Sequence, residues 1–216
     1  MPYYAAQPII GADEQVIAHE ILHRTSKENR FPFGVSPDSA TSSVLFCLFG
    51  NNIKAAPLDG GRPAFINFSG SAIRNRLWKD LDPNNVVIEL LENCDINSEF
   101  LDSVLEAKSL GFSLAIDDYS FESKWEPLLD MVDIIKFDSS QIDINELTNA
   151  SLKIEKKPGQ LWLAEKVECR LCFDRLRAAD FDLFQGFLWG KPEVHEVRLP
   201  NPFSLSFESE LIEFVA

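Results

Sequence analysis

Acidic, amide and amine side chains interrupt the apolar segments of this sequence at regular places. Glu20 lies in VIAHEIL, Glu89 in VVIELL and Lys136 in IIKFD. A charged group in a buried strand is costly unless it is paired, hydrogen-bonded or bound to a metal ion. The whole set, drawn from seven apolar segments, is Glu20, Asn67, Glu89, Asp117, Asp118, Lys136, Glu165 and Gln185. One such residue is easily structural, whereas seven segments that each carry one indicate a functional site.

Most of these side chains are oxygen ligands. Five of them, all with carboxylate or amide groups, are expected to form one rim: Glu20, Asn67, Glu89, Asp117 and Asp118. Oxygen ligands without clustered histidine or thiolate favour hard cations such as Mg²⁺ or Mn²⁺. This chemistry suits metal-assisted phosphodiester hydrolysis, in which Lys136 holds a water or a phosphate oxygen and Glu165 accepts the proton of the water. The alternative is a set of buried ion pairs, for example between Lys136 and Asp117.

The pattern of apolar residues predicts alternating strands and helices around these groups. Short apolar runs predict strands at residues 6–10, 15–22, 63–68, 86–91, 112–118, 134–137, 161–167 and 182–187. Helical periodicity and capping residues predict helices at residues 36–49, 97–110 and 168–179, and a further helix with a basic turn within 141–160. Such a repeat indicates a parallel α/β sheet, open or closed. In a parallel barrel, the carboxyl ends of all strands meet at one rim, which brings the polar set together.

The composition narrows the function further. The chain has 216 residues, with 20 Lys and Arg against 34 Asp and Glu, and a net charge of −14. Such a surface repels long nucleic acids, which are bound mainly through cations, but it admits a small phosphate ester whose charge metal ions neutralise. Membrane binding is not expected, since no apolar run approaches the ~18–20 residues of a membrane span. Without a basic, signal-like start we expect a cytoplasmic protein.

The four cysteines fit a cytoplasmic location, where disulfides are rare. Cys169 and Cys172 form a single C-x-x-C pair, and Cys47 and Cys94 lack the spacing of a second pair of zinc ligands. We therefore interpret Cys169 and Cys172 as ordinary, half-buried helix cysteines rather than as a metal or redox site.

The residues that carry this chemistry also carry a resemblance to the EAL domain family. HEILHR, with Glu20, Leu22 and Arg24, matches the E-x-L-x-R signature of that family. Along the chain, YAAQPI resembles Q-P-I, FINFS resembles N-L-S, ELLE resembles E-L-T-E, AIDDY resembles D-D-F, IIKFD resembles K-I-D, AEKVE resembles A-E-G-V-E, and FQGFLWGKP resembles Q-G-Y-x-x-x-x-P. Each match alone is weak, but their order and spacing over residues 4–192 are specific.

The resemblance implies a fold, a reaction and cofactors. The fold is a TIM-like (β/α) barrel whose first strand runs antiparallel to the others, over residues 1–192. Residues 193–216 would form a C-terminal tail that packs on the barrel or lies at an interface. Two Mg²⁺ or Mn²⁺ ions would support hydrolysis of cyclic di-GMP to linear pGpG.

The resemblance also implies roles for single residues. The ligands of the first metal ion are Glu20, Asn67, Glu89 and Asp117, and Asp118 reaches the second ion or both. Lys136 holds the nucleophilic water and Glu165 is the general base. Glu168 and Gln185 orient neighbouring groups, and Glu92 anchors the loop after Asp118. The residues expected to contact the ligand are Gln7, Leu22 and Arg24.

Two departures from the family pattern concern the reaction directly. The glycine-containing loop D-D-F-G-T-G-Y-S-S is replaced by DDYSFESKWE, which lacks both glycines. Lys166 replaces the glycine of A-E-G-V-E, and strand alternation favours an outward side chain there. The aromatic residues of the altered loop, Tyr119, Phe121 and Trp125, are expected to fill space rather than to stack on a guanine.

These departures leave two functions open. The first is a working cyclic di-GMP phosphodiesterase, since all ligands of the first ion are present. The second is a catalytically silent EAL domain that acts as a cyclic di-GMP receptor or a protein-interaction regulator. ATSSVL, GGRPAFINFS and FQGFLWGKPE further resemble the EAL part of EAL–HDOD proteins. A homodimer or another protein partner is expected from the family, and the altered loop weakens the case for the dimer.

Overall fold

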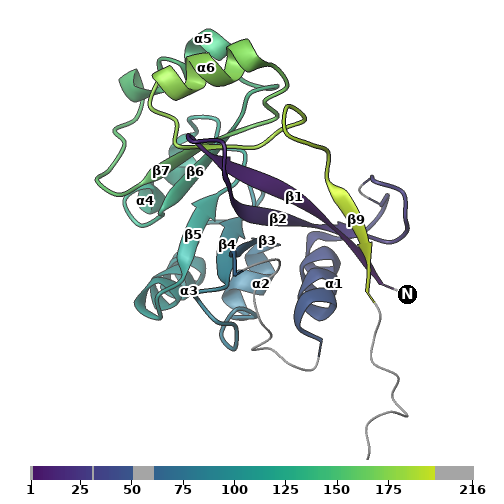
Figure 1. Ribbon diagram of the computed structural model, residues 1–216. Coiled ribbons are helices and arrows are strands. Elements are labelled where there is room, and N and C mark those ends of the chain that lie inside the picture. Colours follow the sequence, from purple (N-terminus) through teal and green to yellow (C-terminus); the bar gives the residue numbers. More distant parts are fainter. Residues whose placement is uncertain (1, 31, 51–60, 198–216) are drawn as a thin grey trace, which may run out of the picture.

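Eight strands form a closed barrel in the computed structural model, which describes residues 2–30, 32–50 and 61–197 (Figure 1). The barrel strands are β1 (Tyr3–Gly11), β2 (Val16–Arg24), β3 (Ala64–Phe68), β4 (Val86–Leu90), β5 (Ser113–Ile116), β6 (Ile134–Asp138), β7 (Leu161–Glu165) and β8 (Leu183–Phe184). β2 to β8 are parallel neighbours in sequence order. β1 closes the barrel because it pairs antiparallel with both β2 and β8. The expected barrel with an antiparallel first strand is confirmed.

Helices lie on the outside of this barrel (Figure 1). They are α1 (Pro37–Phe49), α2 (Gly70–Arg74), α3 (Ser98–Ser109), α4 (Glu126–Leu129), α5 (Ile144–Leu147) and α6 (Arg170–Ala178), with short 3₁₀ turns at Ser123–Trp125 and Ala150–Leu152. Local capping sets where the longer helices begin. The Ser36 hydroxyl accepts a hydrogen bond from the Ser39 amide before α1, and the Asn97 side chain accepts one from the Phe100 amide before α3.

The strands are apolar on both faces, as buried parallel strands must be. The outward residues, such as Ile66, Ile88 and Phe137, pack against the helices in the larger core cluster. The inward residues fill the barrel with one side chain from each strand: Ile9, Ala18, Phe65, Val87, Ala115, Ile134, Leu163 and Leu183. The polar candidate residues occupy the next inward positions, directly above this apolar layer.

Some elements differ from the sequence-based expectation. β5, β7 and β8 are shorter than expected, and two of them end where the backbone turns into the left-handed region, at Asp118 (φ 46°) and Lys166 (φ 53°). Within residues 141–160 the expected helix is reduced to the four residues of α5 and a 3₁₀ turn. The short α2 and α4 were not expected, because elements of four or five residues carry little periodicity.

The cysteine interpretation was wrong. Cys169 and Cys172 form a disulfide at the start of α6, with their Cα atoms 5.3 Å apart. Cys169 is the N-cap residue, and Cys172 lies one turn later, so that the helix start brings the two sulfur atoms together. Cys47 and Cys94 are free and buried.

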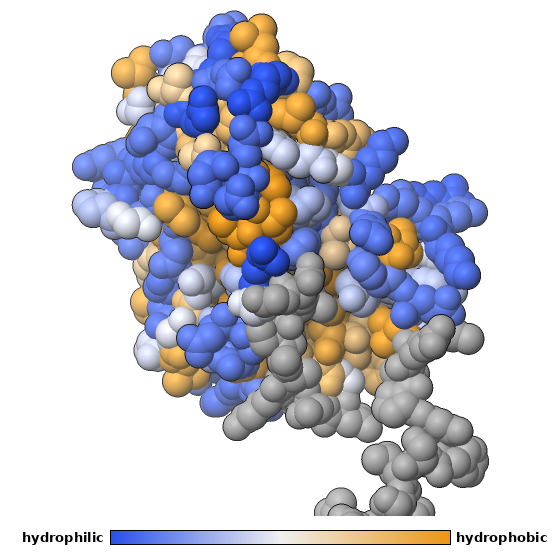
Figure 2. All heavy atoms as spheres, in the orientation of Figure 1, coloured by the Kyte–Doolittle hydropathy of each residue, from blue (hydrophilic) through white to orange (hydrophobic). Residues whose placement is uncertain are grey.

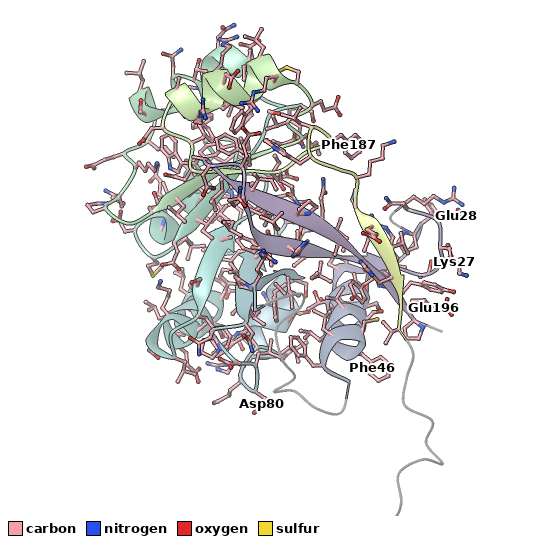
Figure 3. All side chains as sticks on the ribbon, in the orientation of Figure 1. Lys27, Glu28, Phe46, Asp80, Phe187 and Glu196 are labelled. Atoms are coloured by element: carbon pink, nitrogen blue, oxygen red, sulfur yellow. A yellow bond between two sulfur atoms is a disulfide. The ribbon has the colours of Figure 1, made fainter. Side chains whose placement is uncertain are left out.

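A further strand, β9 (Glu193–Glu196), pairs antiparallel with β1 at the outer edge of the sheet. At its end, Glu196 forms an ion pair with Lys27 of the β2–α1 loop over 3.7 Å (Figure 3). β9 therefore attaches the first residues of the segment 193–216 to the barrel, and residues 198–216 lie outside the described part of the chain.

The face of the molecule that Figure 2 draws is largely hydrophilic. Figure 2 shows polar side chains over most of one face, with apolar residues gathered over the middle of the barrel. None of the described helices has the length and hydropathy that a membrane crossing requires.

Candidate active site

A ring of polar side chains lies directly above the inner apolar layer. Inward positions recur every second residue, so each strand places its next inward side chain one level higher. On β2 to β8 this residue comes two positions later, and on the antiparallel β1 it comes two positions earlier. The ring is Gln7, Glu20, Asn67, Glu89, Asp117, Lys136, Glu165 and Gln185. All eight were named as candidates from the sequence, and the barrel brings them to one level.

The Lys136 ammonium is the centre of the ring. Its Nζ lies 2.6 Å from Oε1 of Glu89 and 2.6 Å from Oδ1 of Asp117. Oε1 of Glu165 is 3.0 Å away and Oε1 of Glu20 is 3.6 Å away. The lysine side chain is fully buried, so the four carboxylates act on it without screening by solvent.

Two amides hold Glu20 from either side. Asn67 Nδ2 donates to Glu20 Oε1 over 3.2 Å, and Gln185 Nε2 donates to Glu20 Oε2 over 2.9 Å. The amides come from β3 and from the end of β8, two strands that are distant in sequence. Both oxygens of Glu20 are thus oriented by neutral donors, which leaves its negative charge uncompensated within this contact.

The ring carries more negative than positive charge. Burial lowers the pKa of Lys136, but the charges of Asp117, Glu165, Glu20 and Glu89 together raise it well above its usual value. Burial raises the pKa of Glu89, and it raises the pKa of Glu165 to about 8, while Lys136 opposes both shifts. The lysine is therefore protonated, and without a further cation part of the carboxylates holds protons at neutral pH.

The oxygen atoms of the ring are suitable ligands for a divalent hard cation. Within the described residues, Asn67 Oδ1 and both carboxylate oxygens of Glu89 are buried without a hydrogen-bond donor of good geometry, although Glu89 Oε1 is close to the lysine. The ion pair of Lys136 with Asp117, which the alternative interpretation expected, is present. One ammonium nevertheless does not balance four carboxylates, and the unused acceptors are of the type that Mg²⁺ or Mn²⁺ binds.

A second acidic group adjoins the ring and shares Asp117 with it. One carboxylate oxygen each from Glu92, Asp117 and Asp118 lies within 4.8 Å of the others. Asp118 is half-buried, and burial together with the charge of Asp117 raises its pKa to about 6. The loop after Asp118 contacts Glu92 through the backbone, since Lys124 Nζ donates to the Glu92 carbonyl over 2.8 Å. The carboxylate of Glu92 itself points to the acidic group.

An apolar cavity of about 320 Å³ opens beside the ring, between β2, α1 and the end of β4. Its lining includes Leu22, Val35, Thr41, Asn67, Leu91 and Glu92. Leu22 thus borders the site. Arg24 is buried and its guanidinium binds Asn29 Oδ1 and the His23 carbonyl, which directs it to the β2–α1 loop. Glu168 is exposed in the turn before α6 and is not part of the ring.

Two charged residues of the rim were not among the predicted site residues. Asp138 ends β6, is 2% exposed, and forms an ion pair with Lys166. Asp138 stands in the IIKFD motif two residues after Lys136, a spacing that places both on the inward face and that could have identified it. The contact of Lys166 depends on its left-handed backbone, which strand alternation does not predict.

The aromatic residues of the altered loop fill space, as expected. Tyr119 and Trp125 are buried at 2% and 1% exposure. Phe121 packs edge-on against Tyr119 at 5.5 Å between ring centroids, and it also lies 5.8 Å from Phe137 of β6.

Comparisons with known proteins agree with this geometry. A family model described as EAL domain matches residues 51–192. Cyclic di-GMP phosphodiesterase CdgJ of Vibrio cholerae is 30% identical over 204 residues, which are 93% of this chain and 46% of that protein. The YuxH protein of Bacillus subtilis is 32% identical over 197 residues, 89% of this chain and 47% of that protein. The chain thus spans about half the length of the curated relatives that it matches.

Solved structures share the fold. BlrP1 of Klebsiella pneumoniae, in a complex with calcium and cyclic di-GMP, superposes with a TM-score of 0.67 at 24% identity, over 90% of this chain and 56% of that one. The family match covers most of the chain, and the barrel with its antiparallel first strand agrees with it. The chain belongs to the EAL domain family.

Proposed function

We propose that this chain hydrolyses cyclic di-GMP to linear pGpG with the help of divalent metal ions. The observation that carries the proposal is the buried ring, in which four carboxylates and an amide oxygen converge on one level with a single ammonium. The 30% identity to a cyclic di-GMP phosphodiesterase supports the same substrate. The cavity beside Leu22 has the size of a small-ligand site, which suits one half of a cyclic dinucleotide.

We assign the metal ligands to Glu20, Asn67, Glu89 and Asp117, with Asp118 at the rim. When bound, a divalent ion would activate a water molecule and stabilise negative charge on the phosphate. Mg²⁺ or Mn²⁺ is the proposed ion. BlrP1, a similar structure, was determined with calcium or manganese in its complexes with cyclic di-GMP.

Side chains of the ring carry out proton transfer, water binding and orientation. Glu165 accepts the proton of the attacking water, and its raised pKa of about 8 places it near the range where a general base is effective. Lys136, 3.0 Å from Glu165, holds the water through its ammonium and keeps Glu165 partly ionised. The water oxygen forms a bond to phosphorus, the bond from phosphorus to one ribose oxygen breaks, and that oxygen takes up a proton and leaves as a hydroxyl, so that the product is a linear dinucleotide with a terminal phosphate. Gln185 keeps Glu20 oriented throughout.

The substituted loop favours a second candidate function, a cyclic di-GMP receptor without activity. Residues 119–126 form a loop closed by buried aromatic side chains, and Lys166 adds a cation at the rim. Under this alternative the ring binds metal and ligand, but no bond is broken. A cytoplasmic location, a homodimer and another protein partner stay predictions from the sequence.

A hydrolysis assay distinguishes the two candidate functions, phosphodiesterase and receptor. Purified chain is incubated with cyclic di-GMP and Mn²⁺ or Mg²⁺, and pGpG is separated by chromatography. Hydrolysis is expected in the wild type and is lost in Glu165→Gln, which keeps the size of the side chain and removes its basicity. Calorimetry with Ca²⁺ and cyclic di-GMP then separates the alternatives. Binding without product supports the receptor, and absence of both contradicts a nucleotide function of this ring.

A further inference from the structure

The disulfide between Cys169 and Cys172 lies at the surface, at the start of α6. Cys169 is exposed and Cys172 is half-buried. In the cytoplasmic location that we expect, disulfides are rare, and those that occur are mostly transient, catalytic or redox-sensing. An exposed disulfide of this kind can be reached by a small thiol without any opening of the fold.

The start of α6 stabilises a thiolate on Cys169 when the disulfide is broken. Cys169 is the N-cap residue of this nine-residue helix, and its Sγ accepts a hydrogen bond from the Cys172 amide over 3.1 Å. The first turn of α6 contains no acidic residue, and Arg170 follows the N-cap directly. The amides of a helix start and a neighbouring guanidinium both favour negative charge on sulfur. Cys169 is therefore suited to act as the leaving group in an exchange reaction.

α6 is held on the barrel, beside α5, by contacts that do not involve the disulfide (Figure 1). Phe173 and Leu176 are fully buried, and Phe173 packs edge-on against Phe184 of β8 at 4.6 Å between ring centroids. Arg175 donates a hydrogen bond to Asn145 Oδ1 of α5 over 2.7 Å. The disulfide itself closes only one helical turn, and so short a loop restrains the unfolded chain little. We therefore expect the fold to persist when the bond is reduced.

The other two cysteines of the chain are not suited to such a reaction. Cys47 and Cys94 are free and buried. Burial also raises the pKa of the Cys94 thiol to about 12, so that it is protonated at neutral pH. Exchange with a thiol in solution therefore concerns Cys169 and Cys172.

We propose that Cys169 and Cys172 form a reversible redox site that exchanges with a small-molecule thiol. The thiolate of the small molecule attacks Sγ of Cys169, the bond between the two cysteine sulfurs breaks, and Cys172 leaves as a thiolate that takes up a proton. A second small thiolate attacks the sulfur of the first one in this mixed disulfide, and Cys169 leaves as a thiolate. Two small thiols are thereby oxidised to their disulfide, and the cysteine pair gains two electrons and two protons.

Equilibration with glutathione tests the exchange. The full chain is incubated in mixtures of reduced and oxidised glutathione, quenched with acid and alkylated, and the reduced fraction of Cys169 and Cys172 is measured by mass spectrometry. We expect the same reduced fraction from the oxidised and from the reduced starting material, with an unchanged circular dichroism spectrum. A pair that is reduced only after unfolding in urea, or whose reduction unfolds the chain, would be a structural disulfide and would overturn the proposal.

Two matched variants test the role of Cys169. Cys172→Ser leaves Cys169 as the exposed thiol, and Cys169→Ser leaves Cys172 and keeps a good N-cap residue. At neutral pH, Cys169 in folded Cys172→Ser is expected to react with iodoacetamide at least about threefold faster than in the same variant unfolded in urea. It should also react faster than Cys172 in folded Cys169→Ser. A folded rate at or below the unfolded rate would contradict the proposal. These readouts concern the cysteines alone, so their failure leaves the proposed hydrolysis untouched.

Discussion

Lys136 Nζ lies 3.0 Å from Glu165 Oε1, although the backbone register of β6 and β7 pairs Lys136 with Leu163. The contact is diagonal to the strand pairing, because the register places Glu165 opposite Asp138, while Lys136 and Glu165 occupy the same level of the barrel. This diagonal contact joins the proposed general base to the cation that holds the other carboxylates. The ring is therefore one electrostatic unit, and a change in any member alters the pKa values of the others.

Removal of the central ammonium should destabilise the metal-free chain strongly. Lys136→Met leaves Glu89 and its neighbours buried without a cation, and breaking a buried pair in this way costs about 3–5 kcal/mol. Urea unfolding in the presence of a chelator measures the loss. Lys157→Met, at a solvent-screened ion pair, should leave the free energy of unfolding almost unchanged. Equal effects of the two substitutions would show that the ring is not held by Lys136.

The stability of the metal-free chain should depend on Glu165 in a defined pH range. The folded pKa of Glu165 is about 8, against an ordinary value of 4.5. Between these pH values the folded chain binds more protons at this site than the unfolded chain, so the free energy of unfolding contributed by Glu165 falls as the pH rises. The contribution is fully present below about pH 4.5 and is lost through pH 8.

Glu165→Gln isolates this effect. The difference in the free energy of unfolding between wild type and variant is measured by urea titration at several pH values with a chelator present. As the pH rises from 5 to 8, the wild type should lose free energy of unfolding relative to Glu165→Gln. A difference that is constant over this range would mean that Glu165 is ionised normally in the folded chain.

Gly186 should be needed for the turn that carries Glu165 and Lys166. A Cβ atom at position 186 would lie 2.1 Å from the carbonyl oxygen and 2.3 Å from the amide nitrogen of Val167. Gly186→Ala must therefore move one of two backbones and should destabilise the chain by about 1–3 kcal/mol. At Gly70 the nearest atom to such a Cβ is the mobile end of Arg74 at 3.3 Å, so Gly70→Ala is the matched control. The melting temperatures of both variants test this prediction. An unchanged melting temperature of Gly186→Ala would contradict the close approach of residue 186 to the Val167 backbone.

The sequence predicted the ring because strand periodicity is a strong and simple rule. Each ring residue interrupts an apolar strand two positions from an inward apolar residue, so Glu89 after Val87 and Lys136 after Ile134 follow from alternation alone. The rim could not be predicted in the same way. The pairing of Lys166 with Asp138 depends on a left-handed turn that only the neighbouring strands impose.

The short elements and the disulfide were also not predicted from the sequence. α2 and β9 are too short for periodicity, and they form because Ser69 caps one and β1 offers an edge to the other. The C-x-x-C pair was interpreted as two ordinary residues because a cytoplasmic location was expected, where disulfides are rare, and because Cys47 and Cys94 lack the spacing of a second pair of zinc ligands. Its place at the helix start, which brings the two Cα atoms to 5.3 Å, is a three-dimensional feature.

The two cysteine pairs should react differently with an alkylating reagent. Cys169 and Cys172 are joined at an exposed helix start, so they should take up the reagent only after reduction. Cys94 should remain unreactive in the folded chain, because burial raises the pKa of its thiol to about 12, and Cys47 is buried as well. Mass spectrometry of peptides with and without reductant checks the assignment. Labelling of Cys169 before any reduction would show that the two thiols are free.

The most direct measurement is a crystal structure of the chain grown with Mn²⁺, read by anomalous scattering. The account predicts a peak within the ring, about 2.0–2.6 Å from oxygen atoms of Glu20, Asn67, Glu89 and Asp117. A structure without such a peak, in which Lys136 alone still pairs with the four carboxylates, would contradict it.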